Sequence, residues 1–384
     1  MSAATPAAAD CVIIGGGAVG CSVAHHLALE GRSVVLLEKG ALGAGSTGKC
    51  AGGVRQQFST KVNVEVAMLS RQLLDHFEDA TGSTAAFRHI GYLFLATSDD
   101  EVAQFERNVA LQRSCGLEEV EMLSPQEIHR RLPDIRIEDV RAGTWCPSDG
   151  IAGPNEVTMG YANAARRHGA IILEDCAVTG IAVSNNAVHG VDTLLGHIAA
   201  DTVINCAGAS SRAVGRMAGA TVPVDPYRRH IFVTGPLQGS GEYPMVVDFR
   251  TSFYCHPEGD GMLLGMSDPD EPSSFDTSVN WEFLPHLVEH ATWRIPMLEH
   301  ADIATGWAGL YEVSPDHHAI VGKDPDVEGL WECCGFSGHG FMQAPAIGLL
   351  LAQAVQGRAT DVDIHPYDPS RFQRNDLHPE AVVI

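Results

Sequence analysis

Three glycines near the N-terminus have the spacing of a turn that holds a dinucleotide. Gly15, Gly17 and Gly20 follow a short apolar run that ends at Ile14, and they precede a helical pattern. Glycines at these positions permit a tight turn and the close approach of a pyrophosphate to the backbone. Glu38 stands 18 residues after Gly20, where a carboxylate can accept hydrogen bonds from ribose hydroxyls. The pattern predicts a dinucleotide cofactor, whose phosphates need only backbone N–H groups at a helix start.

A second glycine-rich stretch lies close to the C-terminus. Residues 338–342 read Gly-His-Gly-Phe-Met and precede another apolar helical pattern. Backbone N–H groups at such a helix start can stabilise negative charge. The sequence has one dinucleotide fingerprint, which disfavours an enzyme that uses two dinucleotides. Contact from both ends of the chain suits one long cofactor, so we expect FAD.

One histidine pattern offers a different chemistry. His286, Glu289 and His290 form an H-x-x-E-H motif, an inverted zinc-protease signature. On a helix the two histidines share one face, and the glutamate could polarise a bound water. The motif is short and lacks an evident third ligand. A zinc hydrolase is therefore a remote alternative, and a solvated helix face is the favoured interpretation, with no metal expected.

The composition limits the partners of the chain. Its 384 residues carry 25 Lys and Arg against 48 Asp and Glu, a formal net charge of −23, which disfavours nucleic acid and anionic membranes. Residues 1–9 lack the pattern of a signal peptide, and no apolar run reaches the roughly 18 residues of a membrane helix. Ten cysteines without CxxC spacing indicate reduced thiols. We expect a cytoplasmic protein of about two domains.

Two kinds of sheet are expected to position the candidate residues. One is parallel and begins with a βαβ unit, in which strands over 10–14 and 33–38 flank a helix that ends near Glu30. Further strands are predicted over 171–174, 178–183, 201–205 and 330–334. Helices are predicted over about 60–79, 99–115, 155–169, 281–299 and 344–356, with another starting at Ser124 to Glu127.

The other sheet is predicted from short strands rich in β-branched and aromatic residues over 227–265, broken by Pro and Gly, and from a strand over 91–97. The chain thus leaves the nucleotide-binding part and returns to it. The fold class is α/β, or α+β overall: a Rossmann-type FAD-binding domain with an interleaved antiparallel-sheet substrate domain. The expected bounds are 1–85, 145–220 and 305–384 for the FAD-binding domain, and 86–144 and 221–304 for the substrate domain.

Five stretches of the sequence match a known family. They are CVIIGGGAVG, GSTGKCAGGVRQQF, TVINCAGASS, GWAGLYEVSPDHHAIVG and GFSGHGFMQAPAIG. Together they resemble the D-amino-acid-oxidase (DAO) superfamily of FAD enzymes over nearly the whole chain, and in particular sarcosine oxidases, glycine oxidases and the catalytic subunit of dye-linked L-proline dehydrogenase. The resemblance implies a Rossmann domain that binds FAD and a substrate domain whose antiparallel sheet covers the flavin.

The resemblance also assigns roles to individual residues. Arg55 is similar to an arginine that clamps the substrate carboxylate, a role that suits a bidentate guanidinium. Lys49 lies in a loop that passes the flavin, where it could order a water or favour reduced flavin. Tyr254 and Tyr311 match aromatic positions of the substrate pocket, and residues 339–342 would face the pyrimidine edge of the flavin. The cofactor contacts implied are Gly15, Gly17, Ala18, Val19, Gly20, Glu38, Lys39, Gly45, Ser46, Thr47, Lys49, Cys50, Val178, Cys206, Ala207, Gly208, Gly338, His339, Gly340, Phe341 and Met342.

Three departures from the family pattern qualify these roles. Met342 stands where sarcosine oxidases have a lysine that supports the carboxylate, and Leu263 stands where one of them has a lysine credited with activating oxygen. Both changes predict a more apolar pocket for a bulkier N-substituent. Gly309 replaces a cysteine that tethers FAD in monomeric sarcosine oxidase, so non-covalent FAD is expected.

The favoured hypothesis is oxidation of the C–N bond of a secondary amino acid or N-substituted glycine. The substrate would give its α-hydrogen to flavin N5 as hydride, and the imine would hydrolyse to an oxo acid such as glyoxylate and an amine. O2 would then reoxidise the flavin. An oxidase of N-carboxymethyl β-amino acids is compatible with this hypothesis. The alternative is a catalytic subunit of an L-proline or sarcosine dehydrogenase-like complex, which passes electrons to a partner.

Overall fold

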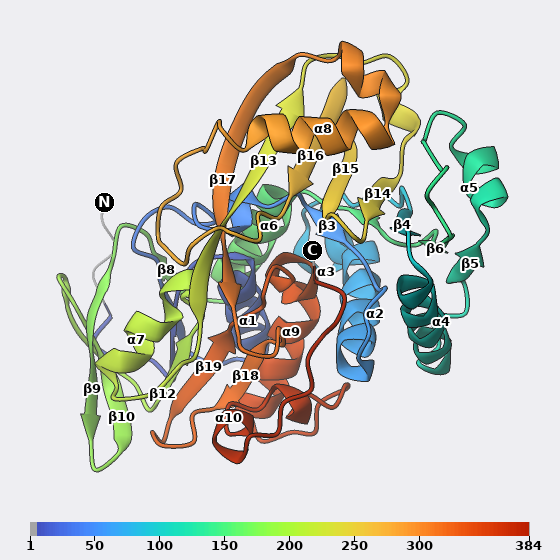
Figure 1. Cartoon of the computed structure of the whole chain (residues 1–384). Helices are drawn as coiled ribbons and strands as arrows, with labels where there is room; N and C mark the ends of the chain where they lie inside the picture. Colours follow the sequence, from blue (N-terminus) through green and yellow to red (C-terminus); the bar gives the residue numbers. More distant parts are fainter. Residues whose placement is uncertain (1–5, 384) are drawn as a thin grey trace.

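The computed structural model describes residues 6–383 and builds them around two large sheets (Figure 1). The first sheet has the strand order β18-β19-β12-β1-β2-β8, and every pair is parallel except β18–β19. Its strands are β1 (Cys11–Ile14), β2 (Val34–Leu37), β8 (Ile171–Leu173), β12 (Thr202–Asn205), β18 (Ile320–Lys323) and β19 (Leu330–Cys334). The predicted parallel sheet is confirmed.

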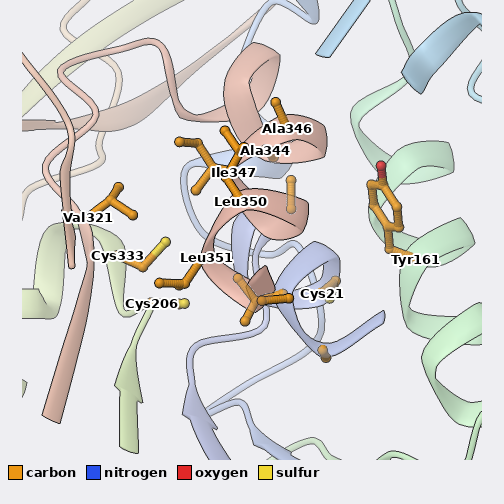
Figure 2. Packing of buried hydrophobic residues seen from close by; sticks show 14 of the residues in the cluster. Cys21, Tyr161, Cys206, Val321, Cys333, Ala344, Ala346, Ile347, Leu350 and Leu351 are labelled. Atoms are coloured by element: carbon orange, nitrogen blue, oxygen red, sulfur yellow. The ribbon is translucent and has the colours of Figure 1, made fainter. Parts of the chain in front are cut away.

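Helices pack against this sheet and against one another. The central helices α1 (Ala18–Leu29) and α9 (Gly340–Val355) pack against each other, with α6 (Pro154–Arg167) against α1 and α2 (Lys61–Asp75) against α9. A Cβ at Gly348 would lie 2.0 Å from the Ser22 hydroxyl oxygen, so a glycine lets α9 approach α1 closely. Figure 2 shows Ile347, Leu350 and Leu351 of α9 in the buried hydrophobic cluster of this domain. Burial of this apolar surface is the main stabilising contribution to the domain.

The second sheet has the order β17-β13-β16-β15-β14-β4-β6-β5. It is antiparallel apart from the parallel pair β14–β4. Helix α8 (Leu284–Arg294) covers its outer face, where Phe232, Leu264 and Leu287 pack together. Its strands are β4 (Tyr92–Ala96), β5 (Glu121–Leu123), β6 (Ala142–Cys146), β13 (Asp225–Thr234), β14 (Met245–Asp248), β15 (Phe253–Glu258), β16 (Gly261–Met266) and β17 (Ile303–Val313).

Smaller elements complete the architecture. Strands β9 (Val178–Ser184), β10 (Ala187–Thr193) and β11 (Gly196–Ala199) form an antiparallel sheet, and β3 (Gly53–Val54) pairs with β7 (Gly150–Ile151). The remaining helices are α3 (Phe77–Thr81), α4 (Asp99–Ser114), α5 (Pro125–Arg131), α7 (Ser211–Met217) and α10 (Arg371–Arg374). The expected start of α5 is confirmed: Ser124 and Glu127 form a capping box.

Several predicted element bounds were wrong. Helix α9 begins at Gly340, four residues before the expected Ala344. Pro345 therefore stands inside the helix and not at its first turn. The helix expected over 281–299 is shorter, since Pro296 disfavours helical geometry at the residue before it and a 3-10 turn follows. The helix expected over 60–79 is divided at His76 into α2 and α3.

Strand β17 changes the expected division into domains. It pairs with β13 along nearly its whole length, from Ile303 to Val313. The expected boundary at residue 305 would cut this strand from the sheet to which it belongs. We therefore propose that the second segment of the substrate domain extends to Val313, and that the FAD-binding domain resumes after it.

Two further findings concern the chain as described. Among residues 6–383, no helix has the length and apolar character needed to cross a membrane. The ten cysteines are free thiols, and eight of them are buried.

Candidate active site

The site is a cavity of about 420 Å³ that is lined from both large sheets. One side comes from the β1–α1 turn, the loop after β2, the end of β12 and the start of α9, and the other side from strands β13, β14, β15 and β17. The predicted residues that line it are Gly15, Gly17, Ala18, Val19, Glu38, Lys39, Gly45, Ser46, Thr47, Lys49, Cys50, Arg55, Cys206, Ala207, Gly208, Tyr254, Tyr311, Gly338, His339, Gly340, Phe341 and Met342.

Three residues singled out from the sequence do not line the cavity. A Cβ at Gly20 would lie 2.0 Å from the Gly15 carbonyl oxygen, so this glycine serves the close packing of helix on strand. Val178 begins β9 and packs in a separate apolar cluster with the small sheet. Leu263 of β16 is buried and is not among the residues that line the cavity, so its effect on the pocket stays a prediction.

The glycine turn is built for an approaching ligand backbone. Gly15 has a φ of +114°, and a Cβ there would lie 2.2 Å from the Cys206 carbonyl oxygen. The Glu38 carboxylate accepts hydrogen bonds from the N–H groups of Gly16 (2.7 Å) and Gly40 (2.9 Å), which fix it at the cavity wall. The first turn of α1 carries no acidic residue. This end fits the phosphates and ribose of FAD.

The start of α9 forms the opposite end of the same wall. Gly338 has a φ of +96°, and a Cβ there would lie 2.4 Å from the Tyr311 ring. His339 is the residue at the N-cap, and Gly340, Phe341 and Met342 form a first turn without an acidic side chain. A ligand that spans both helix starts therefore meets two partially positive helix ends. That arrangement fits FAD, as expected.

Arg55 lies at the cavity but is tied to the protein. Its Nη1 donates to the Gln57 carbonyl (2.5 Å), and its Nη2 donates to the Val382 carbonyl (2.7 Å) and to Nε2 of His339 (3.1 Å). The guanidinium also lies 4.1 Å from the centre of the Phe58 ring. Burial lowers the pKa of Arg55, and burial beside Arg55 holds the pKa of His339 well below its usual value. His339 is thus a neutral acceptor.

An unforeseen carboxylate holds the segment that contains Arg55. Asp149 is fully buried and accepts hydrogen bonds from Gln56 N (2.8 Å), Gln56 Nε2 (3.0 Å) and Gln57 Nε2 (3.0 Å). Burial raises the pKa of Asp149 to about 6. The two glutamines of the RQQF stretch therefore serve to position the backbone that directly follows the arginine.

Sequence reasoning missed a second arginine, Arg229 of β13, which also lines the cavity. Its guanidinium lies 5.2 Å from the centre of the Tyr311 ring and donates to the Arg228 carbonyl (2.9 Å), while its buried Nε has no partner. Within residues 6–383, neither Arg55 nor Arg229 lies within 4.0 Å of a carboxylate oxygen. The partly or fully buried residues Arg228, Arg294 and Arg371, in contrast, each form an ion pair. The alternation of side chains along a strand could have indicated this arginine, because Arg229 and the cavity residue Ile231 are two positions apart and share one face of β13.

Tyrosines line the face of the second sheet. Tyr254 and Tyr311 lie at the cavity as expected, and Tyr92 of β4 joins them. Burial raises the pKa of all three hydroxyls, so they are uncharged. Gly265 makes room for Tyr254, since a Cβ there would lie 2.1 Å from its ring. Burial likewise raises the pKa of the Cys50 thiol to about 11.

Two further positions adjoin the cavity. Glu312 of β17 accepts a hydrogen bond from Gly335 N (3.2 Å), and burial raises the pKa of its carboxyl to about 7; it lies within the GWAGLYEVSPD stretch but was not singled out. A Cβ at Gly309 would lie 3.0 Å from that of Lys49. A larger residue at 309 would therefore crowd Lys49.

The histidine motif lies elsewhere. His286 and His290 are on the outer face of α8, with ring centres 4.8 Å apart. In the part of the chain that the structure describes, no three His, Cys, Asp or Glu side chains come together as a metal site would require. His286, Glu289 and His290 are not among the residues that line the cavity.

Comparison with known proteins agrees with this geometry. The family model described as "DAO: FAD dependent oxidoreductase" matches residues 10–354. Human mitochondrial sarcosine dehydrogenase is 32% identical over 96% of this chain, which spans only 42% of that relative. Glycine oxidase from Geobacillus kaustophilus is 28% identical over 94% of this chain and 97% of its own length.

A solved structure matches over the full fold. The L-proline dehydrogenase from P. horikoshii is 35% identical with a TM-score of 0.92, covering 97% of this chain and 100% of that one. The glycine turn, the second helix start and the family match agree on the cofactor. The chain therefore belongs to the DAO family of FAD-dependent oxidoreductases.

Proposed function

We propose that this chain oxidises the C–N bond of a secondary amino acid or N-substituted glycine. The observation that carries the proposal is a pair of guanidinium groups, Arg55 and Arg229, that line the FAD cavity without carboxylate partners among the described residues. A buried cation without a counter-charge is costly. A substrate carboxylate would supply that counter-charge. FAD, when bound in the cavity, would accept the hydride from the substrate's C–H bond.

Arg229 has more donors to offer than Arg55. A guanidinium carries five N–H groups. Arg229 uses one of them, on the Arg228 carbonyl, whereas Arg55 uses three, on Gln57, Val382 and His339. We propose that Arg229 is the main carboxylate anchor and that Arg55, chosen from the sequence for that role, is the second contact and holds the wall in place.

The surroundings also favour the reactive form of the amine. A substrate ammonium would stand in a buried cavity beside one or two cations, and both burial and like charge lower the pKa of an ammonium group. The uncharged hydroxyls of Tyr92, Tyr254 and Tyr311 add no negative charge to oppose this. The substrate therefore binds as a neutral amine, the form that can release hydride from its α-carbon. The imine product hydrolyses to an oxo acid and an amine.

Anaerobic bleaching of the flavin absorbance tests the proposal. Sarcosine, glycine, L-proline, D-alanine and N-alkylglycines with longer chains are mixed with the purified protein, followed by air. Bleaching by one or more secondary amino acids is expected. A protein that retains FAD and is bleached by none of these amines would contradict the proposed function.

A dehydrogenase is the second candidate, favoured by the likeness to the P. horikoshii L-proline dehydrogenase and human sarcosine dehydrogenase. The same experiment separates the two. Rapid return of colour in air identifies O2 as the acceptor, whereas slow return in air with rapid return on adding an artificial electron-accepting dye identifies a dehydrogenase that passes electrons to a partner.

A further inference from the structure

An aromatic side chain stands at the mouth of the cavity. Phe275 lies in the segment between β16 and α8, residues 267–283, and lines the cavity together with Thr277. Its side chain is nevertheless 61% exposed. An exposed phenylalanine on a cavity wall leaves apolar surface that a bound ligand can remove from water.

The segment that carries Phe275 is fixed by one arginine. Arg228 donates from Nε to Glu271 (3.0 Å), and from Nη1 to Asp276 (2.6 Å) and to the carbonyl of Ser278 (3.0 Å). The Arg228 side chain is only 12% exposed and that of Glu271 only 3%, so this ion pair is largely shielded from solvent and its charged hydrogen bonds are strong. The side chain of Asp276 is 50% exposed. The contacts of Arg228 fall on both sides of Phe275 and hold the ring in place.

Backbone contacts set where the ring lies. Ser273 forms an antiparallel bridge with Tyr227 of β13, and Ser274 N donates to the Pro226 carbonyl (3.1 Å). The segment therefore runs beside the first half of β13, on the side where β16 pairs farther along. Phe275 lies two residues beyond Ser273, at a bend of the chain, and it lines the cavity that this side of the sheet faces.

That side of the sheet is the substrate wall. Arg229 and Ile231 of β13 and Tyr254 of β15 line the cavity from it. Pro226 and Arg229 are three positions apart in the strand, a distance of about 10 Å. A carboxylate held at Arg229 would therefore leave a chain of several carbon atoms within reach of Phe275.

We propose that Phe275 determines specificity by covering an apolar N-substituent of the substrate. This inference rests on the proposed function. The carboxylate stays at the arginines, the C–N bond lies in the cavity, and an alkyl or aralkyl group on nitrogen extends to the mouth and packs on the phenyl ring. Arg228 acts as a positioning residue because it touches the segment and not the ligand.

Ligand binding without turnover tests Phe275. Alkylthioacetates have sulfur in place of the amine and cannot form an imine, and their binding to the FAD-loaded protein is read from the flavin spectrum. The wild type is expected to bind (butylthio)acetate about tenfold more tightly than (methylthio)acetate, from the additional apolar area that is buried. The Phe275→Ala variant should lose this preference while binding the methyl compound as before, and Phe275→Leu should keep part of it.

Two further variants sharpen the test. Arg228→Gln should reduce the preference in the same direction, because it releases the segment. Leu195→Ala removes an apolar side chain of similar exposure, 59%, at the β10–β11 turn away from the cavity, and should leave both affinities unchanged.

The inference is overturned if Phe275→Ala keeps the preference, if it weakens both ligands equally, or if the wild type shows no preference. Failure of the proposed function looks different. In that case no amine bleaches the flavin, while the two thioethers still report on Phe275.

Discussion

The two walls of the cavity are made of different parts of the chain. The cofactor wall is mainly backbone: glycines at 15, 16 and 17, the loop after β2 and the first turn of α9. The substrate wall is mainly side chains of a sheet, namely Arg229, Ile231, Tyr254 and Tyr311. A backbone wall depends on local conformation at a few adjoining residues, whereas a side-chain wall depends on the register of strands far apart in the sequence.

The walls meet at glycines. Gly338 of the cofactor wall leaves space for the ring of Tyr311, and Gly309 of β17 leaves space for Lys49. Small residues at the junction thus let side chains of one wall lie against the backbone of the other. Changes on the cofactor wall are expected to affect FAD retention, and changes on the substrate wall are expected to affect substrate affinity.

The largest effect is expected from Gly15→Ala. A left-handed φ costs an alanine roughly 1–2 kcal/mol, and the methyl group would overlap the Cys206 carbonyl at 2.2 Å. The turn must open, and we expect FAD affinity to fall by about 100-fold or more, measured by titrating the apoprotein with FAD.

Gly31→Ala is the matched control for the glycine turn. Gly31 has a φ of +81°, and no atom lies within 4 Å of the point that a Cβ would occupy, so it isolates the conformational cost. Stability should fall by roughly 1–2 kcal/mol with unchanged FAD affinity. Equal loss of FAD in both variants would mean that close approach of the backbone is not what the turn provides.

The second effect separates the two arginines. Arg229→Met should lower kcat/KM by about 10- to 150-fold, the value of one charged hydrogen bond of about 1.5–3 kcal/mol, and should change the free energy of unfolding by less than about 1 kcal/mol. Arg55→Met should also lower the free energy of unfolding, by about 2 kcal/mol, because it leaves the Gln57 and Val382 carbonyls without their donor.

Steady-state kinetics with the best substrate of the bleaching panel measures kcat/KM. Urea unfolding measures the free energy of unfolding. Arg212→Met is the control: it removes an arginine that pairs with Asp225 on the surface, outside the cavity lining. If Arg229→Met leaves kcat/KM unchanged while Arg55→Met lowers it without loss of stability, the carboxylate anchor is Arg55, as the sequence alone indicated.

The sequence predicted the cofactor wall well because its signals are local. The spacing of Gly15, Gly17 and Gly20 lies within a few residues, and the structure contains the expected turn. The same holds away from the cavity for the capping box of Ser124 with Glu127 at the start of α5. The parallel strands were likewise predictable from short apolar runs.

The substrate wall was predicted only in part. Tyr254 and Tyr311 came from family resemblance, whereas Arg229 and Tyr92 were missed, and Leu263 is not among the residues that line the cavity. Which face of a strand looks into the cavity depends on pairings such as β13 with β17, which no local pattern specifies. The Arg55 to Val382 hydrogen bond joins residues 327 apart in the sequence. No local pattern could therefore predict that Arg55 is held by the C-terminal segment.

The smallest effect concerns Glu312, at the junction of the walls. Its carboxyl has a pKa of about 7 in the folded protein against about 4.5 for the free group, because burial disfavours its charged form. The folded state therefore binds this proton more tightly than the unfolded state, so stability falls as pH rises from 4.5 to 7 and is level above that.

Glu312→Gln keeps an acceptor for Gly335 N and removes the titration. Burial alone would give about 3 kcal/mol, and water in the cavity reduces this to about 1–2 kcal/mol. Urea unfolding of the FAD-loaded proteins should find the variant equal to wild type at pH 4.5 and more stable by that amount at pH 8.5. An advantage of the variant that grows toward low pH would show that the Glu312 carboxylate is stabilised as an anion, and that the junction carries positive charge from both walls.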